Sequence, residues 1–405
     1  MPLNHAIIIG GGIAGAASAL ALTKCNDMTC SVFEIRSEPA TIGGAINLTP
    51  NALRYLEYLG VLSRLKPKGC EVRFIDIISH RTGQSLGKLN FDNLPKFKHR
   101  AIRVVRNDLL QCMLETLREA GVEVQYGMRI DSVEEREQKI AATFENGTRI
   151  EGDILLGCDG VHSAIRRKFI QPDRIAEYTG VATAYGLLDA TRLDNPVRIE
   201  SSSLFSGQHG SAILSYTNLE KSRLFFAAAM AAEDLGSKEG WVLRGHDQEV
   251  LKEDLLRRFS SPAVPFLAEI IGITEHLTLY PVHRLSPNGV WSSGRVLLLG
   301  DAAHAMPPQG ESAGFALEDA ILLSRILEHH QSKSIAELFD RYEQLRRPRI
   351  NAAVKEANLR FETIRDRGWL TTIIVEWMTW AFLSWTASRK EQEFAYDVRD
   401  LDLKF

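Results

Sequence analysis

The chain has 405 residues, of which 45% are hydrophobic and 24% charged, so it is long enough for two domains or one domain with a large insertion. Its formal net charge of −3 provides no field that would attract nucleic acid, and a nucleic-acid partner is not expected. The five cysteines show neither CxxC nor Cys/His spacing, which predicts reduced thiols in a cytoplasmic protein and no metal site. Glycines interrupt the apolar N-terminal stretch and no basic cluster precedes it, so no secretory signal is expected.

The beginning of the chain has the pattern of a strand, a helix and a second strand. An apolar run at 5–10 ends in glycines, the Ala- and Leu-rich segment after Gly15 has helical composition, and residues 30–35 are typical of a strand. A strand, a crossover helix and a parallel strand need ~30 residues, and this segment provides them. The N-terminal region is therefore expected to start a parallel α/β sheet.

Within this unit, Gly10, Gly12 and Gly15 fit the pattern GxGxxG, and Glu34 follows about 20 residues later, where a carboxylate can bind a ribose. The first glycine permits a tight turn, the second lets the backbone approach a pyrophosphate, and the third lets the helix close onto the strand. The helix N-terminus supplies amide hydrogens and a favourable dipole. The pattern predicts a dinucleotide site, with a purely structural glycine turn as the alternative.

The next segments do not continue as a series of regular crossover units. A glycine-containing loop at 41–49 precedes a helix expected from about Pro50. Further on, Arg106 stands just before a helix that either Asn107 or Asp108 would cap.

Two later segments each contain a buried strand that ends in a polar turn. The sequence DILLGCDGVHSAIRRKF gives a strand, a turn at Asp159 and the start of a basic helix. Residues 296–320, VLLLGDAAHAMPPQGESAGFALEDA, give a strand that stops at Asp301, a proline-containing loop, and a helix beginning near Glu311 or Ser312. Since ligands of open α/β sheets collect at the carboxyl ends of strands, Asp301 is expected at the binding site.

Four motifs in this order resemble the class A flavoprotein monooxygenases, single-component FAD-dependent aromatic hydroxylases such as the salicylate and para-hydroxybenzoate hydroxylases. The motifs are GGGIAG with Glu34, the arginine of RNDL, CDGVHSAIR, and LLLGDAAHAMPPQG followed by ALEDA. The resemblance spans about Ala6 to Arg349. It implies an α/β fold with a Rossmann-like FAD-binding domain, an inserted antiparallel β-sheet substrate domain and C-terminal helices. The expected domains are 1–175 with 281–350 for FAD, 176–280 for substrate, and a helical segment at 351–405.

The resemblance also implies roles for individual residues. The glycine-rich turn would hold the pyrophosphate, Glu34 the adenosine ribose, Arg106 the ribityl and phosphate region, and Asp301 a flavin-side hydroxyl. Asp159 would be shared between FAD and the nicotinamide cofactor, with a structural and a kinetic role. Asp159 could instead only cap the following helix, and Arg106 could be a surface ion pair. The residues expected to contact FAD are Gly10, Gly12, Ala14, Gly15, Glu34, Arg36, Gly44, Ala45, Arg106, Asp159, Gly300, Asp301, Pro308, Gly310, Ala313 and Gly314.

The loop at 307–310 would lie along the flavin, because its two prolines have no amide hydrogen for ladder bonds. The helix that follows would direct its positive end at the flavin edge where negative charge accumulates on reduction. Glu311 departs from the family, which has glutamine there, and a carboxylate beside an anionic ring must face solvent or be protonated. His304 is expected to be a packed or hydrogen-bonded residue rather than a base.

Residues from about 178 to 280 alternate or run apolar between turn residues, which predicts an antiparallel sheet over the substrate. Tyr216 is the first catalytic candidate, because a phenol can hydrogen-bond a substrate oxygen, followed by Tyr185 and His209. Each could equally be a core or surface residue, and no general base can be named. Arg223, Phe225 and His283 are further candidates for substrate contact.

The resemblance implies that NADPH or NADH reduces FAD, which reacts with O2 to a flavin hydroperoxide and transfers one oxygen atom to an aromatic, polyketide-like or terpenoid substrate. No second GxGxxG follows a strand, so the nicotinamide is expected to dock transiently. Hydroxylation is the main prediction. An epoxidase, a Baeyer-Villiger enzyme, an FAD-dependent reductase and a non-catalytic nucleotide-binding protein are the alternatives.

The segment 369–385 is strongly apolar and rich in tryptophan, with Glu376 interrupting it. It is slightly short for a membrane span and carries a charge, which favours a buried or interface helix over a membrane anchor. The sequence is compatible with a monomer or a homodimer.

Overall fold

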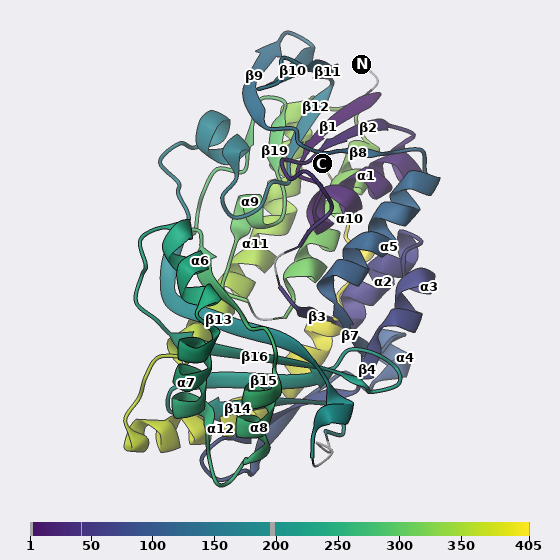
Figure 1. The fold of residues 1–405 in the computed structure, drawn as a ribbon. Coiled ribbons are helices and arrows are strands. Elements are labelled where there is room, and N and C mark those ends of the chain that lie inside the picture. The colour runs from purple at the N-terminus through teal and green to yellow at the C-terminus, as the bar shows by residue number, and fades with distance from the viewer. Residues whose placement is uncertain (1–2, 42, 195–198, 309, 405) are drawn as a thin grey trace.

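The computed structural model describes residues 3–41, 43–194, 199–308 and 310–404. The chain forms a mixed α/β structure in which a largely parallel sheet lies above a larger, mainly antiparallel sheet (Figure 1). Helices pack beside both sheets, and the last helix, α12 (Trp369–Ala395), lies against the lower sheet. The predicted fold class is confirmed.

The upper sheet has six strands, and its central strand comes from the start of the chain. Strand β1 (His5–Ile9) pairs in parallel with a strand on each side, and its residues Ala6 to Ile9 are buried. Burial on both faces explains why this strand is continuously apolar. The order is β18 (Ser292–Ser293), β19 (Val296–Leu298), β12 (Ile154–Gly157), β1, β2 (Thr29–Phe33) and β8 (Val124–Gln125).

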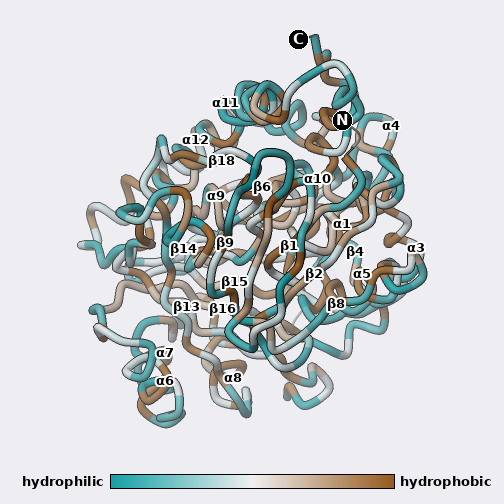
Figure 2. The backbone as a smooth tube through the Cα atoms, turned by 90° about the horizontal axis from the view of Figure 1, so that it is seen from above, coloured by the Kyte–Doolittle hydropathy of each residue, from teal (hydrophilic) through white to brown (hydrophobic). Residues whose placement is uncertain are grey.

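The helices beside this sheet close a single hydrophobic core around it. Seen from above, hydrophobic segments gather on central strands and helices, and hydrophilic stretches occupy outer turns (Figure 2).

The prediction that Asn107 or Asp108 caps a helix is wrong, because the helix begins at Arg106 and its N-cap, Val105, makes no side-chain cap bond. The helices are α1 (Ile13–Asn26), α2 (Pro50–Tyr58), α3 (Leu62–Leu65), α4 (Leu94–Phe97), α5 (Arg106–Glu119), α9 (Asp301–His304) and α10 (Ser312–Leu327), with a π-helical turn at Arg166–Ile170.

Two small antiparallel sheets accompany the upper sheet. One is a hairpin extension, and the other lies between the upper sheet's core and the large lower sheet. The first has the order β11 (Arg149–Gly152), β10 (Lys139–Phe144) and β9 (Ile130–Arg136), and the second has the order β3 (Ala45–Leu48), β7 (Ala101–Val105) and β4 (Cys70–Val72).

The lower sheet has seven strands and extends beyond the range expected for it. Two strands come from 74–90, and one of them pairs in parallel with β14, which would otherwise present an open edge. The order is β17 (Thr278–Arg284), β13 (Glu177–Asp189), β16 (Arg223–Ala231), β15 (Gly210–Tyr216), β14 (Ser202–Gly207), β5 (Phe74–Ser79) and β6 (Ser85–Asn90), accompanied by helices α6 (Lys238–His246), α7 (Gln248–Phe259) and α8 (Phe266–Ile273).

The C-terminal helices are α11 (Ile335–Glu362) and α12 (Trp369–Ala395). Helix α12 turns its charged residues Glu376 and Lys390 toward the protein, whereas Trp377 is 70% exposed and Trp385 is 86% exposed. These two tryptophans are thus not buried within the single chain, and the alternative of an interface helix stays a prediction. Within the part of the chain that the structure describes, no helix is long and apolar enough to cross a membrane.

Candidate cofactor and substrate site

The glycine-rich turn after β1 has the geometry of a phosphate-binding site. Gly10 has a φ of 112°, and a Cβ there would lie 2.4 Å from the carbonyl oxygen of Cys158. A Cβ on Gly15 would lie 1.9 Å from the carbonyl oxygen of Gly10, so only glycine lets α1 close onto the strand. At Gly12, by contrast, a Cβ would meet nothing within 4 Å, and the N-terminus of α1 has no side-chain cap and no acid in its first turn. Its free amides therefore face open space that suits a phosphate.

Glu34 lies directly after β2 and is buried. Its Oε2 accepts a hydrogen bond from the Gly11 amide at 2.9 Å, and its Oε1 accepts one from the Arg36 amide at 3.0 Å. The Arg36 guanidinium lies 3.5 Å from Oε1. Because each carboxylate oxygen has two lone pairs, Glu34 keeps capacity for the hydroxyls of a ribose.

The late motif meets the early one at Gly300. This residue has a φ of 60°, and a Cβ there would lie 3.0 Å from the Cβ of Ala14 at the start of α1. The Gly300 amide donates to Oδ2 of Asp319 at 2.8 Å, which fixes the turn. Asp301 follows at an exposed position, and burial together with the Asp301 carboxylate raises the pKa of Tyr280.

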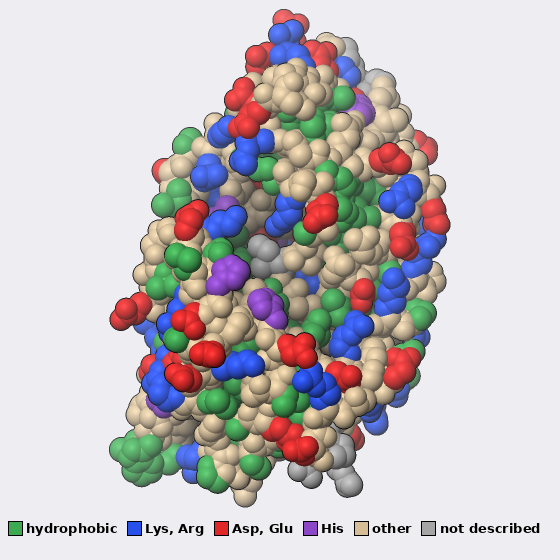
Figure 3. Space-filling model, viewed as in Figure 1, with side chains coloured by type: hydrophobic (Ala, Val, Ile, Leu, Met, Phe, Trp, Pro, Cys, Tyr) green, Lys and Arg blue, Asp and Glu red, His purple; other side chains and the backbone are tan. Residues whose placement is uncertain are grey.

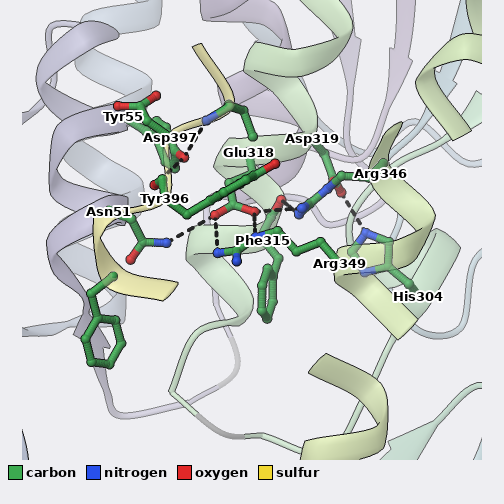
Figure 4. Close-up of polar contacts among 12 residues, drawn as sticks. Asn51, Tyr55, His304, Phe315, Glu318, Asp319, Arg346, Arg349, Tyr396 and Asp397 are labelled. Atoms are coloured by element: carbon green, nitrogen blue, oxygen red, sulfur yellow. Dashed lines mark hydrogen bonds and ion pairs between the residues drawn. The ribbon is translucent and has the colours of Figure 1, made fainter. Parts of the chain in front are cut away.

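A buried ionic network supports this turn from behind (Figure 4). Nε2 of His304 lies 2.7 Å from Oδ2 of Asp319, and Arg346 contacts Asp319 at 2.5 Å and Glu318 at 2.6 Å. Arg349 adds two hydrogen bonds to Glu318. Burial alone would raise the pKa of Asp319, but His304 and Arg346 outweigh burial and hold it well below its usual value. His304 is thus packed and hydrogen-bonded, as predicted.

The loop before β3 is enclosed by the large sheet on one side and by α5 on the other. A Cβ on Gly44 would lie 2.7 Å from Cε2 of Phe225 and 2.9 Å from Cδ2 of Tyr185. The Gly43 amide donates to the Tyr185 hydroxyl at 3.0 Å, and the Arg106 amide donates to the Gly44 carbonyl at 3.0 Å. The structure therefore brings Gly44, Ala45, Arg106 and Tyr185 together, with Ala45 paired to Val105, the residue before Arg106.

Asp159 lies beside the glycine-rich turn, since a Cβ on Gly10 would approach its Cα to 2.9 Å. Its Oδ2 accepts from the amides of Ala164 at 2.6 Å and Ile165 at 3.1 Å, which is the capping role weighed from the sequence. Its Oδ1 is buried without a hydrogen-bond partner among the described residues, and burial raises its pKa. One oxygen of Asp159 therefore remains available to a ligand.

The proline loop and the start of α10 complete this region. Pro308 is exposed, Gly310 has a φ of 84°, and residue 309 lies outside the described residues. Ala313 is buried, and a Cβ on Gly314 would lie 3.5 Å from the Cβ of Ala52, so this helix packs closely against α2. Burial raises the pKa of Glu311, the N-cap residue of this helix.

Of the three predicted catalytic residues, His209 and Tyr216 lie away from the loop at Gly44. His209 is in the turn between β14 and β15, with its Nδ1 3.0 Å from Oδ1 of Asp366 at the surface. Tyr185 pairs laterally with Ala227, and Ala227 with Ile213, so these three side chains share one face of the sheet. Tyr216 is three residues after Ile213 and faces the opposite side, where it joins the core formed with α7 and α8.

Of the remaining substrate candidates, one lies at the loop containing Gly44 and two lie elsewhere. Phe225 lies against Gly44, whereas Arg223 is exposed at the start of β16. The ring of His283 packs on that of His162 with centroids 4.8 Å apart. Sequence reasoning missed Arg103, a buried arginine next to Phe225, although one charged residue in the apolar strand AIRVV was a signal that could have found it.

Together, the glycine-rich turn, the acid after β2 and the Gly300 turn fit a dinucleotide whose far end reaches the loop at Gly44, which defines a flavoprotein. The FAD binding domain family matches residues 4–357, and the chain belongs to it. It is an FAD-dependent oxidoreductase of the monooxygenase class, for which NAD(P)H is the usual reductant.

The chain is similar to several characterised enzymes over most of its length. It is 29% identical to salicylate hydroxylase from Pseudomonas putida, over 84% of this chain and 82% of the relative. It is 30% identical to 3-amino-4-hydroxybenzoate 2-monooxygenase from Streptomyces platensis, over 85% of this chain and 84% of the relative. The crystal structure of a Klebsiella pneumoniae HpxO variant complexed with FAD superimposes with a TM-score of 0.80 at 25% identity, covering 99% of this chain and 100% of that one.

Proposed function

We propose that this protein hydroxylates a small aromatic substrate and consumes NAD(P)H and O2. Bound FAD supplies the redox chemistry, by which electrons from the nicotinamide activate O2 and one oxygen atom is transferred to the substrate. In this proposal the turn at 10–15, Glu34, Arg36, Arg106, Asp159 and the segment 300–314 hold the cofactor. The chain's own contribution is to bind, to orient and to exclude water.

The observation that carries the proposal is the contact of the lower sheet with the loop at Gly44. Tyr185 and Phe225 come from the sheet assigned to substrate, and their rings lie against a glycine whose neighbours include Arg106. A substrate held under this sheet would therefore lie next to the cofactor that the upper sheet holds. Figure 3 shows a hollow between the two parts, with Lys, Arg and His side chains near its rim.

The start of α10 would supply the electrostatic support. Its N-terminal amides have no side-chain cap, so their positive end can favour negative charge on the reduced cofactor. Tyr185 would position the Gly43 loop by its hydrogen bond, which makes it a positioning residue in this account.

The small aromatic substrates of the relatives support an aromatic rather than a polyketide-like or terpenoid substrate. Five free cysteines support a cytoplasmic location. The exposed tryptophans of α12 support an association through 369–385, with a second copy or with a membrane surface.

The test is oxidation of NADPH and of NADH by the purified yellow protein under O2, with a panel of phenols, aminophenols and heteroaromatic acids. Products are identified by mass, with ¹⁸O2 to trace the inserted atom. A product that carries one labelled oxygen supports the proposal. Unchanged substrate masses across the panel, despite bound FAD and oxygen consumption, would overturn it.

A further inference from the structure

Arg103 lies at the centre of the small sheet β3-β7-β4, and its side chain points away from the core of the upper domain. It pairs laterally with Asn47 on one side and with Cys70 on the other, so these three side chains share a face. The alternate residues Ile46 and Val104 belong to the core of the upper domain, whereas Cys70 joins the core of the lower sheet. Arg103 therefore points into the region between the two domains.

This arginine is buried without a counter-ion. It is 5% exposed, and among the described residues its Nε and Nη2 have no hydrogen-bond partner and no carboxylate forms an ion pair with it. Burial lowers its pKa to about 10, so it still carries its charge at neutral pH. An unpaired buried cation is costly, and such groups are normally compensated by an anion.

Other buried arginines of this chain are fully partnered. Arg54 donates to the carbonyls of Phe97, Phe394 and Tyr396. Arg346 has the carboxylates of Glu318 and Asp319. Arg103 differs from these two, although some guanidinium nitrogens of the half-buried Arg341 and Arg367 also lack partners among the described residues.

That location is one aromatic ring away from the loop assigned to the cofactor. The Arg103 guanidinium lies 5.9 Å from the ring centroid of Phe225, the residue whose Cε2 would be 2.7 Å from a Cβ on Gly44. Oδ1 of Asn47, the cross-strand neighbour of Arg103, is also buried without a partner among the described residues, as is Oγ1 of Thr49 two residues further along the chain. A guanidinium on β7, a carboxamide oxygen on β3 and a hydroxyl just after β3 therefore lack hydrogen-bond partners among the described residues.

We infer that Arg103 binds a carboxylate carried by the aromatic substrate. A planar guanidinium matches a carboxylate with two parallel hydrogen bonds, and Phe225 offers a flat apolar surface to the attached ring. Asn47 is placed to accept from a hydroxyl or amino group next to the carboxylate. This inference rests on the proposed function and specifies the substrate class as an aromatic acid.

The test uses the FAD-loaded full chain and pairs of probes that differ only in charge. Three suitable pairs are salicylate with salicylamide, 6-hydroxynicotinate with 6-hydroxynicotinamide, and 3-amino-4-hydroxybenzoate with its amide. Binding is measured by the change in flavin absorption. In the wild type, at least one acid should bind about tenfold tighter than its amide, as expected for a charge-assisted hydrogen bond.

Arg103→Gln should bring the ratio of the affinities for acid and amide close to one. Arg103→Lys should restore part of this ratio, since lysine keeps the positive charge but cannot form two parallel hydrogen bonds. Arg73→Gln is the matched control, because Arg73 is exposed and pairs with Asp92 at the surface. It should leave the ratio unchanged. FAD affinity is measured on every variant and should stay the same.

Two results would overturn the inference. In the first, the wild type binds no acid more tightly than the corresponding amide. In the second, the preference for the acid survives in Arg103→Gln. A parallel loss of FAD affinity with an unchanged ratio would assign Arg103 to the cofactor instead and would also overturn it. Because these readouts need binding and not turnover, they are separate from the test of the proposed function.

Discussion

Ala14 and Gly300 are in contact across the upper sheet: a Cβ on Gly300 would lie 3.0 Å from the Cβ of Ala14. The start of α1 and the turn before α9 thus form one surface, although they come from opposite ends of the domain's sequence. The Asp319 carboxylate holds this surface through the Gly300 amide. The cofactor site consequently depends on the late turn as much as on the glycine-rich turn.

Gly300→Ala should destabilise the protein by about 1–3 kcal/mol and weaken FAD binding, because the backbone conformation is nearly restricted to glycine and the new Cβ meets Ala14. Urea unfolding and an FAD titration measure the two effects. The control is Gly147→Ala, which has a φ of 82° but open space around it in a distant turn. It should lose stability and retain FAD affinity. Equal loss of FAD affinity in both variants would contradict the assignment of the Gly300 turn.

Gly12→Asp should separate folding from cofactor binding. Open space at Gly12 admits a side chain, and aspartate is a good helix N-cap, so the stability of the apoprotein should change by only a few tenths of a kcal/mol. The carboxylate would repel a pyrophosphate at the same amides, which should weaken FAD binding by about 2 kcal/mol. Gly12→Asn provides a neutral side chain of the same shape, and the difference between the two FAD affinities reports the charge. Unaltered FAD affinity in Gly12→Asp would argue against a phosphate at this turn.

Tyr185→Phe removes the hydroxyl that accepts a hydrogen bond from the Gly43 amide. The loss of this hydrogen bond should weaken FAD binding by about 1 kcal/mol, or roughly fivefold. Tyr216→Phe makes the same chemical change on the opposite face of the sheet and should leave FAD affinity unaltered. Flavin fluorescence during titration of the apoprotein measures both. If Tyr216→Phe weakens FAD binding more than Tyr185→Phe does, the two tyrosines have been assigned to the wrong faces of the sheet.

Asp319→Asn should lower the free energy of unfolding by about 3–5 kcal/mol at pH 7, because it removes the carboxylate that pairs with His304 and one of the two that pair with Arg346. The pKa of Asp319 is lowered in the folded state, so its contribution is present above the ordinary value of 3.8 and is lost as the pH falls below it. The stability difference between wild type and variant should therefore be constant from pH 7 to about 5 and shrink in more acidic solution. Urea unfolding followed by tryptophan fluorescence measures it. A difference that grows on acidification would contradict the network.

The parts of the site that the sequence predicted are those where a local pattern determines the geometry. Gly15 closes onto the Gly10 carbonyl and Ile8 within one βαβ unit, so its place in the local pattern identifies it, whereas the close neighbour of Gly10 is Cys158, at the end of a strand distant in the sequence. The late turn at Gly300 was predicted from a motif rather than from local physics, and its contact with Ala14 depends on sheet order. Tyr216 could not be assigned to a face, because its orientation is fixed by the register of β15 with β16.

The remaining differences arise where a partner distant in the sequence overrides hydropathy. Helix α12 turns its tryptophans outward, since Glu376 is held inward by Ser79 at 2.5 Å and by Arg81 at 2.6 Å. Arg103 is the opposite case, a charged residue in a buried strand whose lack of a partner is visible only in three dimensions. Hydropathy predicts the average environment of a segment and not the partners of its polar side chains.

The most direct test of the central claim is an equilibrium titration of folded apoprotein with FAD, carried out with wild type, Gly12→Asp and Gly300→Ala. A single site formed by both turns predicts one FAD per chain in the wild type and a weaker affinity in each variant. If the wild type binds no FAD, or if either variant binds it as tightly as the wild type does, these two turns do not enclose one cofactor.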